Sequence, residues 1–357
     1  MSRPTAIRFA APSPVAPARG LTFPNEARVP TVRARIAVAA ALAELTDDPA
    51  AFAAREADLA AKLFAGGEPP LTRDPAPVAA LLRRNTRRRA RLGHYLPAMW
   101  QFDGDWFWAL DRLHHLEARL RDHDLLAGDD PLSELHPERA ALPDVDEPLA
   151  PLEFFYSVRS PYSYLALVAM CEFQASWPTV RIRPVLPMAM RGITIPRAKG
   201  LYTLRDVKRE ADRLGIPFGR AADPLGDGAR RLLQVFPLAT GTEGQLAFLA
   251  SAATATWAEG VDVAHDAGLR FVAERAGIAW PDAHRRIQAG AGIDYAEANR
   301  LELLAAGLWG VPCYRVGAFA AWGRDRFWML DELLRRAQPG PPRERTQSAI
   351  RPVASAS

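Results

Sequence analysis

The pattern of apolar and polar positions predicts strands and helices in a defined order in the second half of the chain. PLEFFY at 151–156 is a short apolar run that ends at polar residues, as a buried strand does. SPYSYLALVAMCEF at 160–173 opens with serine and proline, a preferred pair for a helix N-cap and first helical position. VRIRPVL at 180–186 alternates like a second strand. From Tyr202 to about Ala306, helical spacing dominates.

The last part of this half predicts a strand hairpin and a closing helix. GVPCYRV at 310–316 and AFAAW at 318–322 fit two short strands, and DRFWMLDELLRR at 325–336 fits an amphipathic helix. The order strand, helix, strand, helical insertion, hairpin and helix is that of a thioredoxin-like domain with a helical insert. We therefore expect an α/β fold, with this domain at 151–337.

Composition changes between the patterned regions and predicts the domain limits. AGDDPLSELHPERAALPDVDEPLA at 127–150 is rich in Asp, Glu and Pro, so we expect a linker there. The segment 338–357 has little to bury and is expected to be a disordered tail. Residues 1–126 then form a separate first region.

The first region contains an incomplete repeat of the second. GHYLPAMWQFDGDWFWALDRLHHLEARL at 93–120 parallels 307–334, and the matched positions are Pro97 with Pro312, Trp108 with Trp322, and Asp111–Arg112 with Asp325–Arg326. GLTFP at 20–24 similarly parallels GIPFG at 215–219. The opening strand and its SPYS turn have no counterpart. We expect residues 1–126 to be a partial, mostly helical repeat that docks as a partner without a site of its own, unless the missing half is encoded upstream.

Composition excludes several classes of protein. The 45 basic and 41 acidic residues leave a formal charge of +4, which does not suggest a nucleic-acid binder. The two cysteines, Cys171 and Cys313, form no CxxC, so neither a disulfide scaffold nor a cysteine zinc site is expected, and the histidines show no helical i, i+4 metal pair. We therefore expect no bound metal. The N-terminus lacks a secretory apolar stretch, and no window reaches membrane-spanning length, so we expect a cytoplasmic protein with no membrane partner.

Four motifs in order resemble one family. FFYSVRSPYSYLA at 154–166 is similar to the first strand and helix start of 2-hydroxychromene-2-carboxylate isomerases and kappa-class glutathione transferases. Tyr202, Asp206 and Arg209, followed by GIP at 215–217, resemble that family's next motif, and the closing GVP and WGRDR resemble its last two. The resemblance covers about half of the chain and implies the insert-bearing thioredoxin-like fold that DsbA also has.

The resemblance implies that glutathione is the cofactor and that Ser160 is the catalytic residue. Ser160 lies where a strand passes into a helix, so its hydroxyl is among free backbone amides at the positive end of the helix dipole, which favours a thiolate. The alternative is that Ser160 only caps the helix. The resemblance also implies a cis peptide bond before Pro312 and pairing of the Val311 backbone with the cysteinyl part of glutathione, whereas a plain strand-leading proline is the alternative.

Further candidate residues would hold the ends of the ligands. Arg324 and Asp325 precede the last helix, where they suit the zwitterionic γ-glutamyl end, although Asp325 could serve only as an N-cap. The basic run from Arg191 to Arg213 could hold an anionic substrate, or form a solvated helix face. Cys313 could form a mixed disulfide with glutathione, or pack in the core.

Three functions remain open from the sequence. The leading one is a glutathione-dependent isomerase or transferase that acts on a small electrophile, with carboxylated products of aromatic degradation as one substrate class. The second is a DsbA-type oxidoreductase relative without a CxxC, and the third is a non-catalytic scaffold, with a homodimer as a further option.

Overall fold

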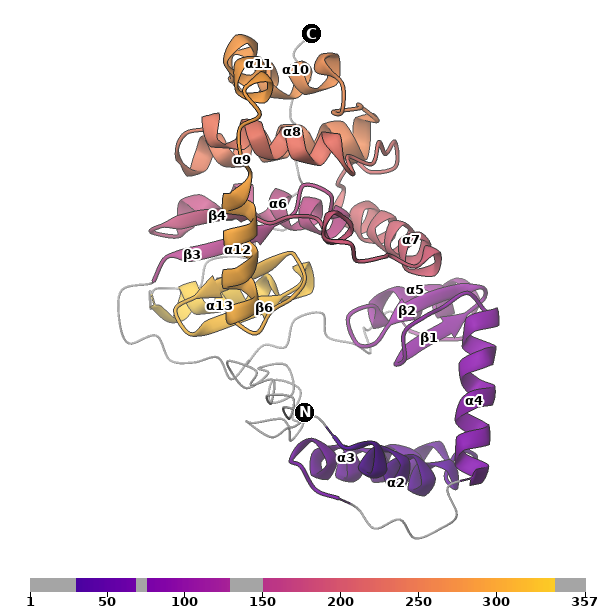
Figure 1. The fold of residues 1–357 in the computed structure, drawn as a ribbon. Coiled ribbons are helices and arrows are strands. Elements are labelled where there is room, and N and C mark those ends of the chain that lie inside the picture. Colours follow the sequence, from indigo (N-terminus) through magenta and orange to yellow (C-terminus); the bar gives the residue numbers. More distant parts are fainter. Residues whose placement is uncertain (1–29, 69–75, 129–149, 338–357) are drawn as a thin grey trace. The chain divides into compact units, whose positions relative to one another are not determined.

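The computed structural model describes residues 30–68, 76–128 and 150–337 (Figure 1). The chain divides into two compact units, Met1–Leu142 and Pro143–Ser357. The second unit contains the predicted thioredoxin-like domain. Most of the expected linker and the whole expected tail lie outside the described residues, as does GLTFP at 20–24.

A four-stranded mixed sheet forms the centre of the second unit, with strand order β4-β3-β5-β6. β3 (Leu152–Tyr156) pairs in parallel with β4 (Val180–Pro184) and antiparallel with β5 (Cys313–Val316), and β5 pairs antiparallel with β6 (Phe319–Trp322). Every residue of β3 is buried, which explains why its sequence is apolar on both faces apart from Glu153. The four expected strands are confirmed, each slightly shorter than its predicted segment.

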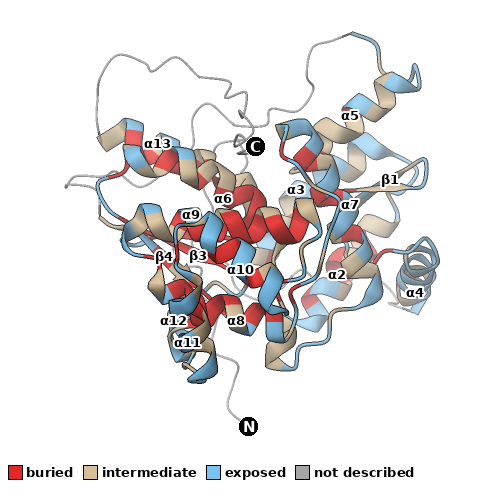
Figure 2. Ribbon diagram, turned by 90° about the horizontal axis from the view of Figure 1, so that it is seen from above, coloured by how far each residue is buried: buried red, intermediate tan, exposed pale blue. Residues whose placement is uncertain are grey.

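Helices follow the strands in the expected order. α6 (Pro161–Phe173) connects β3 to β4, and α13 (Trp328–Ala337) closes the unit. The insertion between β4 and β5 consists of α7 Arg197–Leu214, α8 Asp227–Val235, α9 Gly241–Thr254, α10 Asp266–Arg275, α11 Trp280–Gln288 and α12 Asp294–Ala305. Figure 2 shows that buried residues are concentrated on β3, α6 and α9. This sheet and helix order confirms the α/β fold with a helical insert.

The two faces of the sheet bury different side chains. On one face, Phe154 of β3 stacks on Tyr314 of β5 with ring centroids 5.6 Å apart, and Phe327 contacts both Tyr314 and Phe173 of α6. On the other face, Phe155 and Cys313 pack with Leu303 of α12. Because successive strand residues point to opposite faces, α6 and α12 are held on opposite sides of the sheet.

A buried carboxylate joins β3 to the strands on either side of it, β4 and β5, on the α12 side of the sheet. Glu153 of β3 accepts hydrogen bonds from Arg183 of β4 at 2.6 Å and 2.9 Å and from Arg315 of β5. Arg315 also pairs with Glu302 of α12 at 3.0 Å. Burial acts to raise the pKa of Glu153, but the hydrogen bonds from the two arginines outweigh it and hold the pKa below its usual value.

The described part of the first unit is mostly helical. Its helices are α2 (Val32–Ala43), α3 (Pro49–Phe64), α4 (Ala76–Arg91) and α5 (Leu113–Asp122). A hairpin of β1 (Met99–Phe102) and β2 (Asp105–Trp108) precedes α5. α2 packs on α3 through Ala34, Val38, Leu59 and Leu63.

The two hairpins pair with the same register. Met99 opposes Trp108 in the first unit, and Cys313 opposes Trp322 in the second, so the matched tryptophans hold equivalent positions before a helix. The tandem repeat and the domain limits at 126, 150 and 337 remain our proposals. Among the described residues, no helix is both long enough and apolar enough to cross a membrane.

Candidate functional site

Ser160 is the N-cap of α6 and follows the turn that leaves β3. Its backbone is extended, with φ −89° and ψ 114°, and its Oγ accepts a hydrogen bond from the Ser163 N–H at 3.2 Å. Pro161 occupies the first helical turn, as the sequence predicts. Ser160 is only partly buried, whereas Ser163 is fully buried. A serine hydroxyl has a donor proton besides its acceptor lone pairs, so the capping bond leaves the O–H able to donate to a ligand.

Two contacts fix the start of α6 against the helical insertion. Tyr162 donates from its hydroxyl to Asp206 of α7 at 2.6 Å, and Tyr202, one helical turn before Asp206, donates to the other carboxylate oxygen at 3.3 Å. Arg159 forms two hydrogen bonds with Asp223, at 2.6 Å and 2.8 Å. The tyrosine and aspartate of the second motif therefore orient the helix start that carries Ser160.

The GIP motif has a similar positioning role. α7 ends at Gly215, whose φ of +66° is a left-handed conformation that favours glycine. The chain then turns back so that the Pro217 carbonyl accepts a hydrogen bond from the Tyr164 hydroxyl on α6 at 3.0 Å.

Val311 and Pro312 directly precede β5, whose first residue, Cys313, pairs with Phe155 of β3. The Val311–Pro312 peptide bond is cis, as the resemblance implies. The Pro312 carbonyl accepts a hydrogen bond from the Gly323 N–H at 2.8 Å, which ties this bond to the segment that carries Arg324 and Asp325.

Arg324 and Asp325 lie in a 3-10 turn, η5 (Arg324–Arg326), and α13 begins only at Trp328. The expectation that the closing helix starts at Asp325 is therefore wrong, and so is the alternative that Asp325 caps α13. The turn η5 contacts α6, so both residues are on the side of the sheet where Ser160 begins its helix.

The Arg324 side chain is largely buried next to other charged groups. Burial, followed by repulsion from Arg213, lowers the pKa of Arg324, while Glu210 acts in the opposite direction. The Arg324 Nε is buried and has no hydrogen-bond partner among the residues that the structure describes. A buried guanidinium donor without a partner suits an anionic ligand group.

Neither cysteine is suited to thiolate chemistry. Cys313 is fully buried, its Sγ lies 2.9 Å from the Gly310 carbonyl oxygen, and burial raises the pKa of its thiol well above the usual value. Burial also raises the pKa of Cys171 on α6 to about 11. Of the two alternatives for Cys313, these observations favour core packing over a mixed disulfide.

A pair of exposed tryptophans lies beside Val311 and Pro312, and sequence reasoning did not assign it to the site. The ring centroids of Trp309 and Trp322 are 5.3 Å apart. Trp309 has 56% of its surface exposed, and Trp322 has 40%. The Lys199 ammonium of α7 lies 5.9 Å from the Trp309 ring. A Cβ on Gly310 would come within 2.9 Å of the Trp322 indole nitrogen, so glycine is required for this close approach. The sequence signals were a tryptophan directly before the GVP motif and the tryptophan that opens WGRDR.

Arg191, at the end of the 3-10 turn η2 (Met188–Arg191), is partly buried. Burial and then repulsion from Arg300 lower the pKa of Arg191. The Arg191 Nε is buried, and within the described ranges of the chain it has no hydrogen-bond partner. Of the basic run Arg191–Arg213, Lys208 forms an exposed ion pair with Asp212, and Arg213 pairs with the buried Glu210.

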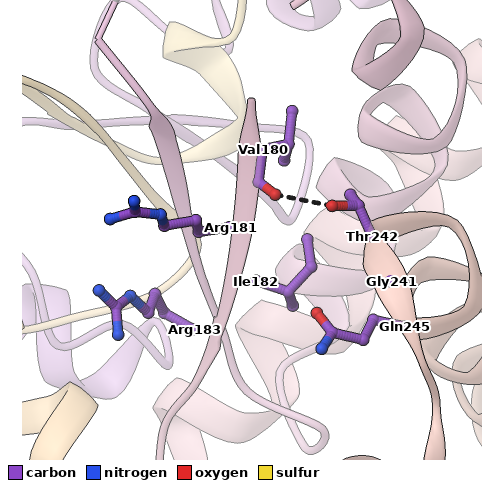
Figure 3. Close-up of a pocket in the computed structure, with 7 residues that line it drawn as sticks. All are labelled: Val180, Arg181, Ile182, Arg183, Gly241, Thr242 and Gln245. Atoms are coloured by element: carbon purple, nitrogen blue, oxygen red, sulfur yellow. Dashed lines mark hydrogen bonds between the residues drawn. The ribbon is translucent and has the colours of Figure 1, made fainter. Parts of the chain in front are cut away.

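An open hollow of about 510 Å³ lies elsewhere, where the edge strand β4 faces the start of α9 (Figure 3). Thr242 there donates to the Val180 carbonyl at 2.8 Å, while Arg181 and Arg183 point away from α9. The residues that line it are Val180, Arg181, Ile182, Arg183, Gly241, Thr242 and Gln245. None of the predicted site residues is among them, so we do not include this hollow in the candidate site.

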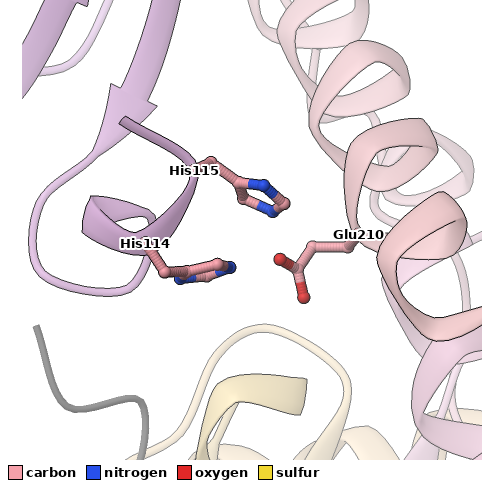
Figure 4. A group of neighbouring side chains, drawn as sticks. All are labelled: His114, His115 and Glu210. Carbon is pink, nitrogen blue, oxygen red and sulfur yellow. The ribbon is translucent and has the colours of Figure 1, made fainter. Parts of the chain in front are cut away.

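Figure 4 labels three further side chains that could bind metals. His114 and His115 lie in α5 of the first unit, with ring centroids 4.1 Å apart. Glu210 lies in α7 of the second unit and pairs with Arg213 at 2.8 Å. The sequence expectation that no metal is bound remains a prediction.

Several solved structures of known proteins are similar to part of the chain. No curated protein matches the chain. The chain is similar to a solved 2-hydroxychromene-2-carboxylate isomerase (21% identity, TM-score 0.46, covering 52% of this chain and 95% of that one). It is also similar to a probable DsbA oxidoreductase from Streptomyces coelicolor, with 18% identity and a TM-score of 0.42 over 53% of this chain and 89% of that one. A third similar structure is the cytosolic disulfide reductase DsbM from Pseudomonas aeruginosa, solved with GSH, with 18% identity and a TM-score of 0.38 over 52% of this chain and 95% of that one.

A family model supplies the classification. The model of the DSBA-like thioredoxin domain matches residues 151–335, which is just over half of the chain and contains the whole sheet of the second unit. The chain therefore belongs to the DSBA-like thioredoxin domain family.

Proposed function

We propose that this protein is a glutathione-dependent isomerase or transferase in which Ser160 stabilises the glutathione thiolate. The thiolate sulfur adds to the electron-poor carbon of a conjugated carbonyl compound, and the π electrons of the attacked bond move towards the carbonyl oxygen. Rotation about the new single bond and expulsion of the thiolate regenerate glutathione and give the isomer. The transferase alternative stops at the adduct, which takes up one proton. Neither route needs an oxidant.

The observation that carries this proposal is the placement of Ser160. It caps α6 through its oxygen while retaining a proton to donate, at a helix end whose partial positive charge favours an anion. A hydrogen bond to a charged group contributes about 1.5–3 kcal/mol. Since one pKa unit corresponds to about 1.4 kcal/mol, such a bond lowers the pKa of a bound thiol by about 1–2 units.

Other residues support binding of the remainder of glutathione. Arg324 offers a buried donor without a partner to the γ-glutamyl carboxylate, and Asp325 beside it suits the ammonium group. The Val311 backbone at the start of β5 is suited to pair with the cysteinyl part like an added strand.

The electrophile would contact the exposed tryptophan pair. Trp309 and Trp322 offer an aromatic surface next to Pro312, and Lys199 adds a positive charge at its edge. A flat, conjugated carboxylate matches both features. We therefore favour carboxylated products of aromatic degradation as the substrate class.

The chemistry of the cysteines argues against the DsbA-type alternative. Dithiol exchange requires an attacking thiolate and a second sulfur to resolve the mixed disulfide. The turn at 160–163 contains two serines, and burial raises the pKa of both cysteines of the chain. The scaffold alternative predicts neither glutathione binding nor turnover.

Substitutions at Ser160 separate capping from thiolate stabilisation. S160A removes both the cap and the donor, whereas S160D keeps a good N-cap but places a carboxylate where the thiolate would lie. S160T keeps the hydroxyl and serves as the matched control. We expect glutathione to raise the melting temperature of the parent and of S160T, and both to turn over a conjugated electrophile.

S160A and S160D should lose most of this activity, S160D despite its intact cap. Equal turnover by S160D and the parent would contradict the proposed role of Ser160. If glutathione neither stabilised the parent nor supported turnover, the scaffold alternative would be favoured.

A further inference from the structure

Helix α4 of the first unit carries an unusual concentration of positive charge. Six arginines occur within nine residues, at Arg83, Arg84, Arg87, Arg88, Arg89 and Arg91. No Asp or Glu occurs in the sequence from residue 75 to 102. Among the described residues, no carboxylate forms an ion pair with any of the six, and all except Arg89 are exposed. The net charge of +4 conceals this because acidic residues elsewhere balance it.

Five of these arginines form one stripe along the helix. At 3.6 residues per turn, Arg83, Arg87 and Arg91 follow one another along one side, and Arg84 and Arg88 run next to them, so the five span about 140° of the circumference. With Ala80 and Ala90, four of them line an open hollow of about 770 Å³ along this side, namely Arg83, Arg84, Arg87 and Arg91. We call these five residues the arginine stripe.

We propose that the arginine stripe binds the phosphate backbone of double-stranded nucleic acid, without sequence preference. The stripe from Arg83 to Arg91 rises about 12 Å, so its five charges are spaced about 3 Å apart along the axis. One strand of duplex DNA carries one phosphate per about 3.4 Å of its axis, which matches this spacing. Guanidinium groups also bind phosphate oxygens in bidentate geometry, a property that lysines lack.

The same segment is poorly suited to a membrane surface. A helix that lies in a bilayer interface needs bulky apolar residues opposite its basic face. Between Arg83 and Arg91, the residues other than arginine are Asn85, Thr86 and Ala90. The alanine is the single apolar side chain there, and the exposed apolar side chains next to the segment, Leu82 and Leu92, are too few to form an apolar face along it.

Counterion release sets the expected strength and salt dependence. Five phosphate contacts on duplex DNA give a slope of about −4.5 for the logarithm of the association constant against the logarithm of the salt concentration. Affinity should therefore fall about 500-fold between about 50 and 200 mM salt. Each arginine removed from the stripe should reduce the slope by about one.

The test is fluorescence anisotropy of a labelled, random-sequence duplex of about 20 base pairs with the full-length chain. R83Q/R87Q and R84Q/R88Q each remove two charges from exposed positions and keep good helix formers. The matched control is R33Q/R35Q, which removes two exposed arginines from α2 of the same unit. Circular dichroism verifies that each variant keeps its helices.

We expect each stripe variant to bind the duplex on the order of 100-fold more weakly at about 50 mM salt, with a slope smaller by about two, and the control to bind like the parent. Equal losses in the stripe variants and in the control would overturn the proposal. So would tighter binding to phosphatidylserine vesicles or to poly-glutamate than to the duplex. An undetectable interaction between the duplex and the parent at low salt would also overturn it.

Discussion

Substitution of Glu153 by glutamine should destabilise the second unit strongly. Glu153 is buried and accepts hydrogen bonds from Arg183 and Arg315, on the strands to either side of β3. E153Q removes the buried carboxylate that both guanidinium groups share and leaves them with an amide and the more exposed Glu302. Removal of one partner from a buried ion pair costs about 3–5 kcal/mol, and because the arginines are partly solvated and keep Glu302 we expect the lower end of this range, about 3 kcal/mol. The melting temperature should fall by about 6–12 °C.

Two further variants show whether this cost arises from the shared position of Glu153. R183Q should cost less, because Glu153 keeps Arg315 as a partner. E274Q, which breaks the exposed Arg270–Glu274 pair of α10, should cost less than about 0.5 kcal/mol. Urea unfolding of the four proteins measures these differences. A loss in E153Q no larger than that in E274Q would refute the reasoning.

The pH dependence gives an independent check on Glu153. Because the pKa of Glu153 is lower in the folded state than in the unfolded state, its contribution to stability is fully present above the unfolded pKa of about 4.3. This contribution is lost as the pH falls through the folded pKa. The stability difference between the parent and E153Q should therefore be constant near neutral pH and shrink in acid. A difference that grows below about pH 4 would contradict this assignment.

Three further predictions concern the ligand sites. W309A should raise the KM for an aromatic electrophile several-fold and leave the KM for glutathione nearly unchanged. Steady-state kinetics, with each substrate varied in turn, measures both values. Equal changes in the two KM values would show that Trp309 is not part of the electrophile site. Cys171 in the folded protein should react with iodoacetamide about 200-fold more slowly than free cysteine at about pH 8, because burial raises the pKa of its thiol to about 11. Labelling of Cys171 in the folded protein as fast as that of free cysteine would contradict the raised pKa. Calorimetric titration should give one glutathione per chain, because the first region lacks a counterpart of the SPYS turn, and a stoichiometry of two would mean that this region has a site of its own.

Local sequence signals predicted the elements that depend on neighbouring residues. The serine and proline at 160 and 161 specify a cap and a first helical turn, and both occur in the structure. The run of β3, which is apolar apart from Glu153, likewise predicts a strand buried on both faces.

Features that depend on distant residues could not be predicted in the same way. The closing helix begins three residues after Asp325, because a 3-10 turn follows Gly323, whose N–H is held by the Pro312 carbonyl. The Trp309–Trp322 pair requires both the β5–β6 register and the close approach over Gly310. The arginine stripe was visible in the sequence, but the balanced net charge of the whole chain obscured it.

The pKa of the bound glutathione thiol tests the central claim most directly. The ultraviolet absorbance of the thiolate, followed as a function of pH in complexes with the parent, S160T, S160A and S160D, gives this pKa for each protein. We expect a value below that of free glutathione in the parent and S160T, a value about 1–2 units higher in S160A, and a still higher one in S160D. The same thiol pKa in the parent and in S160A would contradict the assignment of Ser160 as the residue that stabilises the thiolate.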